Sequence, residues 1–247
     1  MAKQSGLGDN AYIDGYDLSN DTLELSRIAG GPAALVITGI DKSAFERIGG
    51  QRTGEIAFKV AHNDAALQAH PALSPQTGAA MQVMYFRGTT LGNPAAGMIA
   101  RQVDYAATRA NDGMLSYDVQ CLSDGFGLEW GTSLTAGKRT DTAATNGTGV
   151  DFAAASSFGL QMYTQLFSFT GTSVTIKVQE SSDNGGGDAF ADVTGATTGA
   201  LTTRTTVRVA TATNLAVERY LRVVTTGTFS SAVFAVMVVR NSAVPTF

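Results

Sequence analysis

The side chains best suited to chemistry are few in this sequence, and they are widely spaced. The two histidines, His62 and His70, lie eight residues apart on different predicted elements, a spacing that matches neither a zinc site nor a metalloprotease helix. We therefore expect surface or turn histidines and no metal. Asp183, Asn184 and Asp188 lie in a glycine-rich loop whose oxygens could hold Ca²⁺, but the loop lacks the twelve-residue EF-hand pattern. A hairpin tip explains the same residues, and calcium stays open as an alternative.

The single cysteine and the single tryptophan are interpreted as structural residues. Cys121 lies on the inward face of an alternating strand, whereas a nucleophilic thiol needs an accessible, electropositive setting. Trp130, together with Phe126, could form an aromatic sugar platform, but we expect it to pack at the end of the first domain. No nucleophile elbow or phosphate loop is present, and no carboxylate pair stands out. We expect no catalytic residue, no cofactor and no enzyme activity.

The composition indicates a globular chain with a largely covered surface. Of 247 residues, 44% are hydrophobic, but only 15% are charged, well below the roughly 25% of a typical soluble domain. Few surface charges give little protection against association, so we expect other subunits to cover much of the chain. The net charge of −4 and the absence of a Lys/Arg run argue against sequence-specific nucleic-acid binding. The longest apolar run, Ala232–Val239, is too short to span a bilayer, and the N-terminus does not resemble a signal peptide, so we expect no membrane partner.

Alternating apolar residues predict a mainly β fold. Asp14-Gly15 predicts a two-residue hairpin turn, because a type I′ turn needs positive φ at both central positions. Short helices are expected at residues 43–48, ended by Gly49-Gly50, and at residues 64–70, ended by Pro71. The expected strands cover residues 33–40, 54–63, 81–87, 102–108, 114–122, 160–169, 173–180, 189–193, 205–210, 219–225 and 232–240.

A stretch of small residues suggests how the chain is divided. Residues 131–157 are almost entirely Thr, Ala, Gly and Ser and show no apolar periodicity, which is unusual within one compact domain. We interpret this stretch as a junction that becomes ordered by docking in an assembly. The prediction is a β-barrel or sandwich domain with a short helix over residues 1–139. A β-sandwich of jelly-roll or immunoglobulin-like type follows over residues 140–247.

Two stretches of the first domain carry a resemblance to a known family. The runs ITGIDKSAFERIGGQRTGEIAFKV and YFRGTTLGNPAAGMIARQVDYAATRANDGMLSYDVQCLSDG resemble the major tail, or tail tube, proteins of long-tailed (siphovirus) bacteriophages. The later runs TGTSVTIKVQESSDNGGG and VERYLRVVTTGTFSSAVFAVMVVRN look like β-sandwich modules appended to phage virion proteins.

The resemblance implies a structural virion protein. It implies that six copies close into a ring, that rings stack into a tube, and that genome DNA passes through the lumen without sequence-specific binding. Other tail proteins would be partners, and assembly in the host cytoplasm would place the chain in the virion tail. The second domain would project outward and touch glycans, and a carbohydrate- or surface-binding virion module acting through this domain is the alternative function.

By analogy with the family, contacts between subunits or rings are expected in the Thr38–Arg52 region and in the N-terminal arm. An ordinary connection packed on its own domain is the alternative interpretation of these segments. The residues expected to make the contacts are Ile40, Asp41, Phe45, Arg47 and Arg52.

Overall fold

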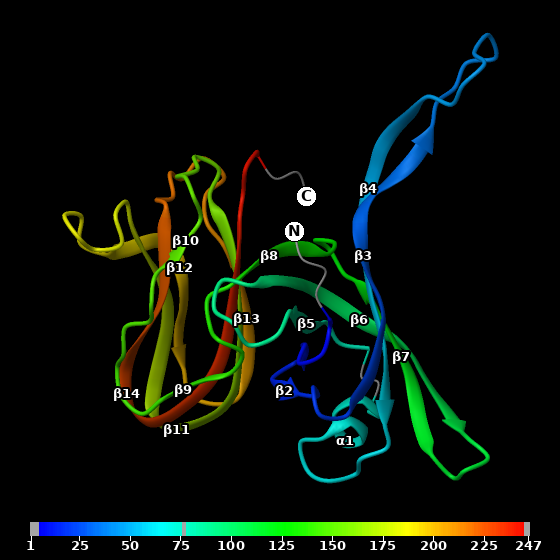
Figure 1. The fold of residues 1–247 in the computed structure, drawn as a ribbon, viewed down its shortest axis with the longest axis horizontal. Coiled ribbons are helices and arrows are strands. Elements are labelled where there is room, and N and C mark those ends of the chain that lie inside the picture. Colours follow the sequence, from blue (N-terminus) through cyan, green and yellow to red (C-terminus); the bar gives the residue numbers. More distant parts are fainter. Residues whose placement is uncertain (1–4, 76–77, 245–247) are drawn as a thin grey trace. The chain divides into compact units, whose positions relative to one another are not determined.

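The computed structural model describes residues 5–75 and 78–244, so the first four residues of the predicted N-terminal contact arm lie outside the described part. Within that part, the expected mainly β fold is confirmed: one short helix, α1 (Ala69–Leu73), accompanies the strands (Figure 1). No helix among the described residues has the length and apolar character needed to cross a membrane.

The strands form two compact units. The strands, in chain order, are β1 (Asn10–Ile13), β2 (Tyr16–Asp17), β3 (Thr22–Val36), β4 (Arg47–Ala61), β5 (Met81–Phe86), β6 (Pro94–Arg109), β7 (Leu115–Ser123), β8 (Glu129–Ser133), β9 (Arg139–Asp141), β10 (Val150–Asp151), β11 (Leu160–Ser181), β12 (Ala191–Leu201), β13 (Thr205–Ala210) and β14 (Tyr220–Arg240). Of the described residues, unit 1 comprises 5–20, 82–97 and 130–244, and unit 2 comprises 21–75, 78–81 and 98–129. The chain therefore passes between the units at places other than the expected boundary after residue 139.

Unit 1 is built on the pair β11–β14. These strands pair antiparallel over their whole length, from Leu160 opposite Arg240 to Ser181 opposite Tyr220. The sequence predicted two separate strands in each segment, which is wrong: the ladder continues through register shifts on either side of Gly171. Glycine tolerates the irregular backbone of a bulge, so the chain bends there without ending the strand.

The other strands of unit 1 extend this pair into one sheet. The strand order in this sheet is β12-β11-β14-β8-β6-β5-β1-β2. Only the first residues of β6 belong to unit 1. The predicted hairpin turn between β1 and β2 is confirmed, because Asp14 and Gly15 have φ values of 48° and 79°.

Both faces of the β11–β14 pair are largely buried where residues 160–166 pair with residues 234–240, as the apolar run at residues 232–240 predicted. One face belongs to a large core cluster that includes Leu166 and Phe234, each with no exposed surface. The other face belongs to a second cluster, in which Tyr163 and Met237 pack with Tyr12. Alternation of side chains along a strand explains how neighbouring residues enter different clusters.

The small-residue stretch at residues 131–157 is part of unit 1, so its interpretation as a junction between two folded units is wrong. It contains β9 and β10, which both pair with β14. Its few large apolar residues are used as core, with Leu134 and Val150 buried. Strands of two or three residues are too short to show an apolar period, so the sequence pattern did not predict them.

Unit 2 is a four-stranded antiparallel sheet in the order β3-β4-β7-β6. The predicted β6–β7 hairpin is confirmed. One face of the sheet, which we call the covered face, is buried. Its members include Phe58 of β4 and Val119 of β7, which lie opposite each other. Helix α1 buries Ala69 and Leu73. The other face, which we call the open face, carries charged and small residues on the same strands.

The two predicted helices differ from the observed structure. Residues 43–48 form bends and the start of β4 instead of a helix, because a segment of this length gains little helical stability without a surface to pack on. The second helix lies later than expected and contains Pro71. Proline is tolerated in the first turn, where its missing N–H would have no helical partner.

Candidate subunit-contact surface

The β3–β4 hairpin of unit 2 extends into a long two-stranded ribbon. Register pairs run from Thr22 opposite Val60 through Gly30 opposite Gly54 to Val36 opposite Arg47. We call residues 33–50 the arm. In Figure 1 it is the blue ribbon that continues beyond β6 and β7 of the same unit.

Local hydrogen bonds close the tip of the arm. The Ile37 N–H donates to the Glu46 carbonyl at 3.0 Å, and the Glu46 N–H donates to Thr38 Oγ1 at 2.8 Å. These bonds make a closed loop without any contribution from a helix. The tip is therefore a structured end of a hairpin.

The arm leaves its large apolar side chains uncovered. Ile40 is fully exposed, and Phe45 retains 71% of its surface. Isolated exposed apolar residues are common, but a group on one segment marks an interaction site. The remaining members of the group, each about half exposed, are Leu35, Val36, Ile37 and Ile48.

The five residues expected to make subunit contacts fall into two places. Ile40, Asp41, Phe45 and Arg47 lie at or next to the tip, where the Arg47 guanidinium stands 5.0 Å from the centre of the Phe45 ring. Arg52 lies at the base of the arm, opposite Pro32 in the ladder. Their role in contacts remains a prediction.

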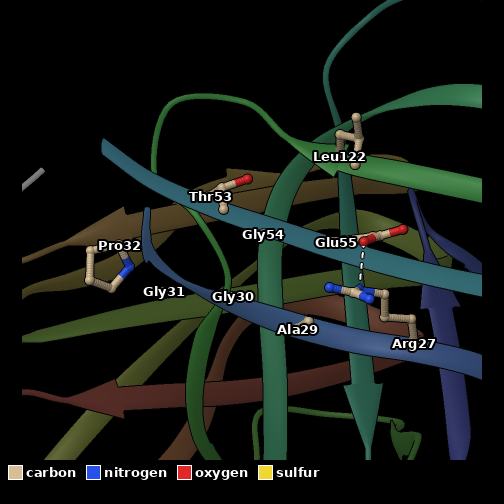
Figure 2. Close-up of a pocket in the computed structure, with 9 residues that line it drawn as sticks. All are labelled: Arg27, Ala29, Gly30, Gly31, Pro32, Thr53, Gly54, Glu55 and Leu122. Atoms are coloured by element: carbon tan, nitrogen blue, oxygen red, sulfur yellow. Dashed lines mark ion pairs between the residues drawn. The ribbon is translucent and has the colours of Figure 1, made fainter. Parts of the chain in front are cut away.

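A hollow of about 240 Å³ lies on β3, β4 and β7 at the base of the arm (Figure 2). We call it the glycine hollow. Gly30 and Gly54 pack closely on buried Leu128: a Cβ at Gly54 would lie 2.8 Å from Leu128 Cβ. The hollow is lined by Arg27, Ala29, Gly30, Gly31, Pro32, Thr53, Gly54, Glu55 and Leu122.

Glu55 is the carboxylate that lines the glycine hollow on the open face. Glu55 accepts from Arg27 at 2.7 Å, the ion pair drawn in Figure 2, and from the Gln120 amide at 2.7 Å. A second hollow of similar volume lies on the same sheet and includes Asp104 and Asp118 in its lining. Glu55 is thus already paired within the chain, and so is Asp118, whose carboxylate lies 3.5 Å from the Lys59 ammonium.

The two histidines, which the sequence placed on unrelated surface elements, meet on unit 2. Their ring centres are 5.0 Å apart. His62 Nδ1 hydrogen-bonds the Tyr117 hydroxyl at 3.1 Å, and His70 Nδ1 hydrogen-bonds the Tyr105 hydroxyl at 2.9 Å. The tyrosine rings stack at 4.3 Å, and burial raises the pKa of Tyr105 to about 12. No group of three or more His, Cys, Asp or Glu side chains with metal-site geometry occurs in residues 5–75 and 78–244.

The glycine-rich loop of unit 1 is held by its own hydrogen bonds. Asp183 accepts backbone N–H groups from Gly186 and Gly187, and these bonds hold the pKa of its carboxyl below the usual range. Asp188 accepts from the N–H and hydroxyl of Ser182 at 2.8 and 2.9 Å. The geometry thus matches the hairpin-tip interpretation, with Asn184 at a positive φ of 63°.

Both Cys121 and Trp130 were predicted to be structural residues, and the structure confirms this prediction for Cys121 only. Cys121 has no exposed surface, and burial raises the pKa of its thiol to about 12, so the expected structural thiol is confirmed. Trp130 is half exposed, so its expected core role is wrong; it meets Tyr85 edge-on at 6.2 Å. Alternation along β8 explains the exposure, since the preceding residue, Glu129, points to the buried side.

No family model matches the chain, and neither does any curated protein. Among solved structures, it is similar to a chain in the tail of an empty gene transfer agent particle with C6 symmetry, at 16% identity over 51% of this chain and 97% of that one (TM-score 0.40). It is also similar to the SPP1 Dit hub protein, at 11% identity over 93% and 98% (TM-score 0.31). A chain of the phage p2 baseplate matches at 8% identity over 96% and 99% (TM-score 0.36). These neighbours are phage tail, hub and baseplate proteins or a gene transfer agent tail, but such distant likenesses assign no role to this chain.

Proposed function

We propose that this chain is a structural subunit of a bacteriophage tail tube. Copies assemble into stacked rings, six to a ring, and genome DNA passes through the lumen. The observation that carries the proposal is the arm, whose large apolar side chains stay exposed among the described residues. The same segment resembles tail tube proteins, and this resemblance implies that the exposed surface contacts other subunits.

The edges of the unit 2 sheet support assembly as well. Among the described residues, β3 pairs only with β4, and the part of β6 beyond residue 98 pairs only with β7. Exposed edges are sites of unwanted pairing in a monomer, whereas in a ring each edge can pair with the neighbouring copy. The low charge of the chain suits a subunit covered on several sides.

The charge of the chain suits a conduit for DNA. With a net charge of −4 and no basic run, the protein offers no extended cationic surface that would hold phosphates. DNA would then slide along the lumen without being bound. Proteins of the tail ends would be the other partners.

Electron microscopy of the purified chain tests the proposal. We expect rings or tubes of uniform width in negative stain, and loss of both in an Ile40→Asp, Phe45→Asp double variant. Leu67→Asp is the matched control, because Leu67 is an exposed apolar residue of unit 2 outside the arm. Circular dichroism should show unchanged β content in both variants. A wild-type chain that stays monomeric at high concentration, even with tail assembly factors present, would contradict the proposal.

A further inference from the structure

We propose that His62 and His70 together bind one divalent transition metal ion, such as Zn²⁺, through their Nε2 atoms. The two side chains form a cluster with Tyr105 and Tyr117 in unit 2, which we call the His–Tyr cluster. Its residues are separate from the arm and from the lining of the glycine hollow. The inference therefore goes beyond the proposed function and does not depend on it.

The fold brings the two histidines together by turning the chain back after β4. His62 directly follows the last residue of β4, and His70 is the second residue of α1. The buried carboxylate of Asp21 fixes the connection between them, because it accepts from the Asn63 side-chain amide and from the Ala69 N–H, each at 2.8 Å. The His70 N–H also donates to the Asn63 carbonyl at 3.0 Å. Two residues on different elements thus become neighbours in space.

Tyrosine hydroxyls orient both imidazoles through the same ring nitrogen. His62 Nδ1 lies 3.1 Å from the Tyr117 hydroxyl, and His70 Nδ1 lies 2.9 Å from the Tyr105 hydroxyl. The two tyrosine rings stack at an interplanar angle of 5°, which holds their hydroxyls in place. An Nδ1–H that donates to an oxygen leaves the lone pair on Nε2, the arrangement that metal-binding histidines adopt. Neither Nε2 atom has a hydrogen-bond partner among residues 5–75 and 78–244.

The separation of the two imidazole rings fits two ligands of one ion. A metal about 2.1 Å from a ring nitrogen lies about 3.2 Å from the centre of that ring. Two imidazoles around such an ion have centres about 5.2 Å apart at the tetrahedral angle and about 4.5 Å apart at a right angle. The observed separation of 5.0 Å lies between these values. The ring planes are inclined by 56°, so the rings are not stacked on each other.

The donor atoms determine the class of ion. Imidazole nitrogen suits Zn²⁺, Cu²⁺ and Ni²⁺, whereas Ca²⁺ and Mg²⁺ prefer oxygen ligands. His62 is exposed and His70 is half-buried, so solvent reaches both rings and water can complete the coordination. A bound ion fastens α1 to the end of β4. Because only the folded chain holds the two imidazoles together, binding stabilises unit 2.

Zinc titration of the full chain, prepared without a histidine tag, tests the site. Isothermal titration calorimetry should show one bound ion per chain in the wild type and at least tenfold weaker binding in His62→Ala and in His70→Ala. The chain has only these two histidines, so each variant removes half of its imidazole donors. Asp64→Asn is the matched control, because it removes an exposed carboxylate from the connection between the histidines. This variant should bind zinc as the wild type does.

Two further measurements keep both ligands in place. The imidazole C–H signals of both histidines in the NMR spectrum of the wild type should shift together as zinc is added. Tyr117→Phe removes only the hydroxyl that orients His62, so it should weaken zinc binding about tenfold, with β content unchanged by circular dichroism. Equal binding in the wild type and both histidine variants, or a titration that leaves either imidazole unaffected, would overturn the inference and leave the proposed function standing. A wild-type chain that forms no rings or tubes would count against the proposed function alone.

Discussion

Two long hairpin-like pairs, β11–β14 in unit 1 and β3–β4 in unit 2, use the same backbone arrangement with opposite surroundings. Both contain a glycine irregularity in mid-strand, at Gly171 and at Gly31, each with positive φ. The β11–β14 pair buries apolar side chains on both faces where residues 160–166 meet residues 234–240, and the β3–β4 pair leaves its distal half exposed. Backbone pairing is common to both, so it cannot be what distinguishes a core from a contact surface.

The difference shows where the free energy of each pair comes from. In β11–β14 the burial of side chains in two core clusters stabilises the fold. In the arm the same kind of side chain stays in water, so its burial energy is available for binding another molecule. Substitutions in the two pairs should therefore separate stability from assembly.

The largest expected effect on stability is that of Phe234→Ala. Phe234 has no exposed surface in β14, and removing a buried phenyl ring costs about 3–5 kcal/mol of unfolding free energy. Phe45→Ala in the arm should change the same quantity by less than about 0.5 kcal/mol. Urea unfolding of monomeric protein, followed by circular dichroism, measures both. Equal losses would show that the arm is not an uncovered surface in solution.

Breaking an ion pair should lower stability more in unit 1, where the pair is buried, than in unit 2. Asp141 of unit 1 is buried, pairs with Arg139 at 2.7 Å and accepts the Thr225 hydroxyl at 2.6 Å. Asp141→Asn should cost about 1.5–3 kcal/mol, the range for hydrogen bonds to charged groups. Glu55→Gln, which disrupts the exposed pair with Arg27 in unit 2, should cost less than about 1 kcal/mol. Urea midpoints test the ranking, and a larger loss for Glu55→Gln would reverse it.

Glycine substitutions probe the point where the arm joins its unit. Gly54→Ala places a methyl group against Leu128 and should cost about 1–3 kcal/mol. Gly49→Ala lies within the arm, where its Cβ would meet Pro32 at 3.4 Å, an ordinary contact, and should change stability by less than about 0.5 kcal/mol. Thermal unfolding distinguishes the two. Equal tolerance would mean that Leu128 moves away freely.

The smallest effect should come from a surface charge on β12. The ammonium of Lys177 donates to Asp192 at 2.6 Å and holds the pKa of that carboxyl below its ordinary value. A depressed pKa stabilises the fold at pH values above the unfolded pKa of about 3.9, and this contribution disappears as the pH falls through the folded pKa. Asp192→Asn should therefore lower stability at pH 7 by less than about 1 kcal/mol, because the pair is exposed.

The pH dependence of that loss can be measured against a control. The difference between wild type and Asp192→Asn should shrink when unfolding is repeated at pH values falling from 5 toward 2. Lys177→Gln, which removes the cation, serves as the control: in that background the Asp192→Asn difference at pH 7 should be smaller and should change less with pH. A constant difference across this range would mean that Lys177 does not act through the charge of Asp192.

The sequence predicted local structure well where side-chain alternation or turn chemistry was strong. The Asp14-Gly15 turn, the β6–β7 hairpin and the burial of Cys121 were all readable, because each depends on residues within a few positions. The sequence failed where packing by distant strands decides the outcome. The short strands β9 and β10 gain their order from β14, whose paired residues lie 91–95 positions from those of β9 and 69–71 from those of β10.

The candidate site shows the same limit. The resemblance implied subunit contacts in the Thr38–Arg52 segment, which stay a prediction, and Gly49-Gly50 was expected to end a helix. It did not show that residues 43–48 form bends and the start of β4, that the two histidines meet, or that Ala29, Thr53 and Leu122 line one hollow.

By itself, the sequence determined a mainly β chain with few charges, an apolar β14 and an apolar segment at the future arm. These properties depend on composition and on a period of two residues, which each stretch of chain carries alone. The tertiary structure decided which apolar stretch became core and which stayed exposed. That choice depends on whether distant strands supply a covering surface: β14 finds one in β11, while the arm extends beyond the strands of its own unit.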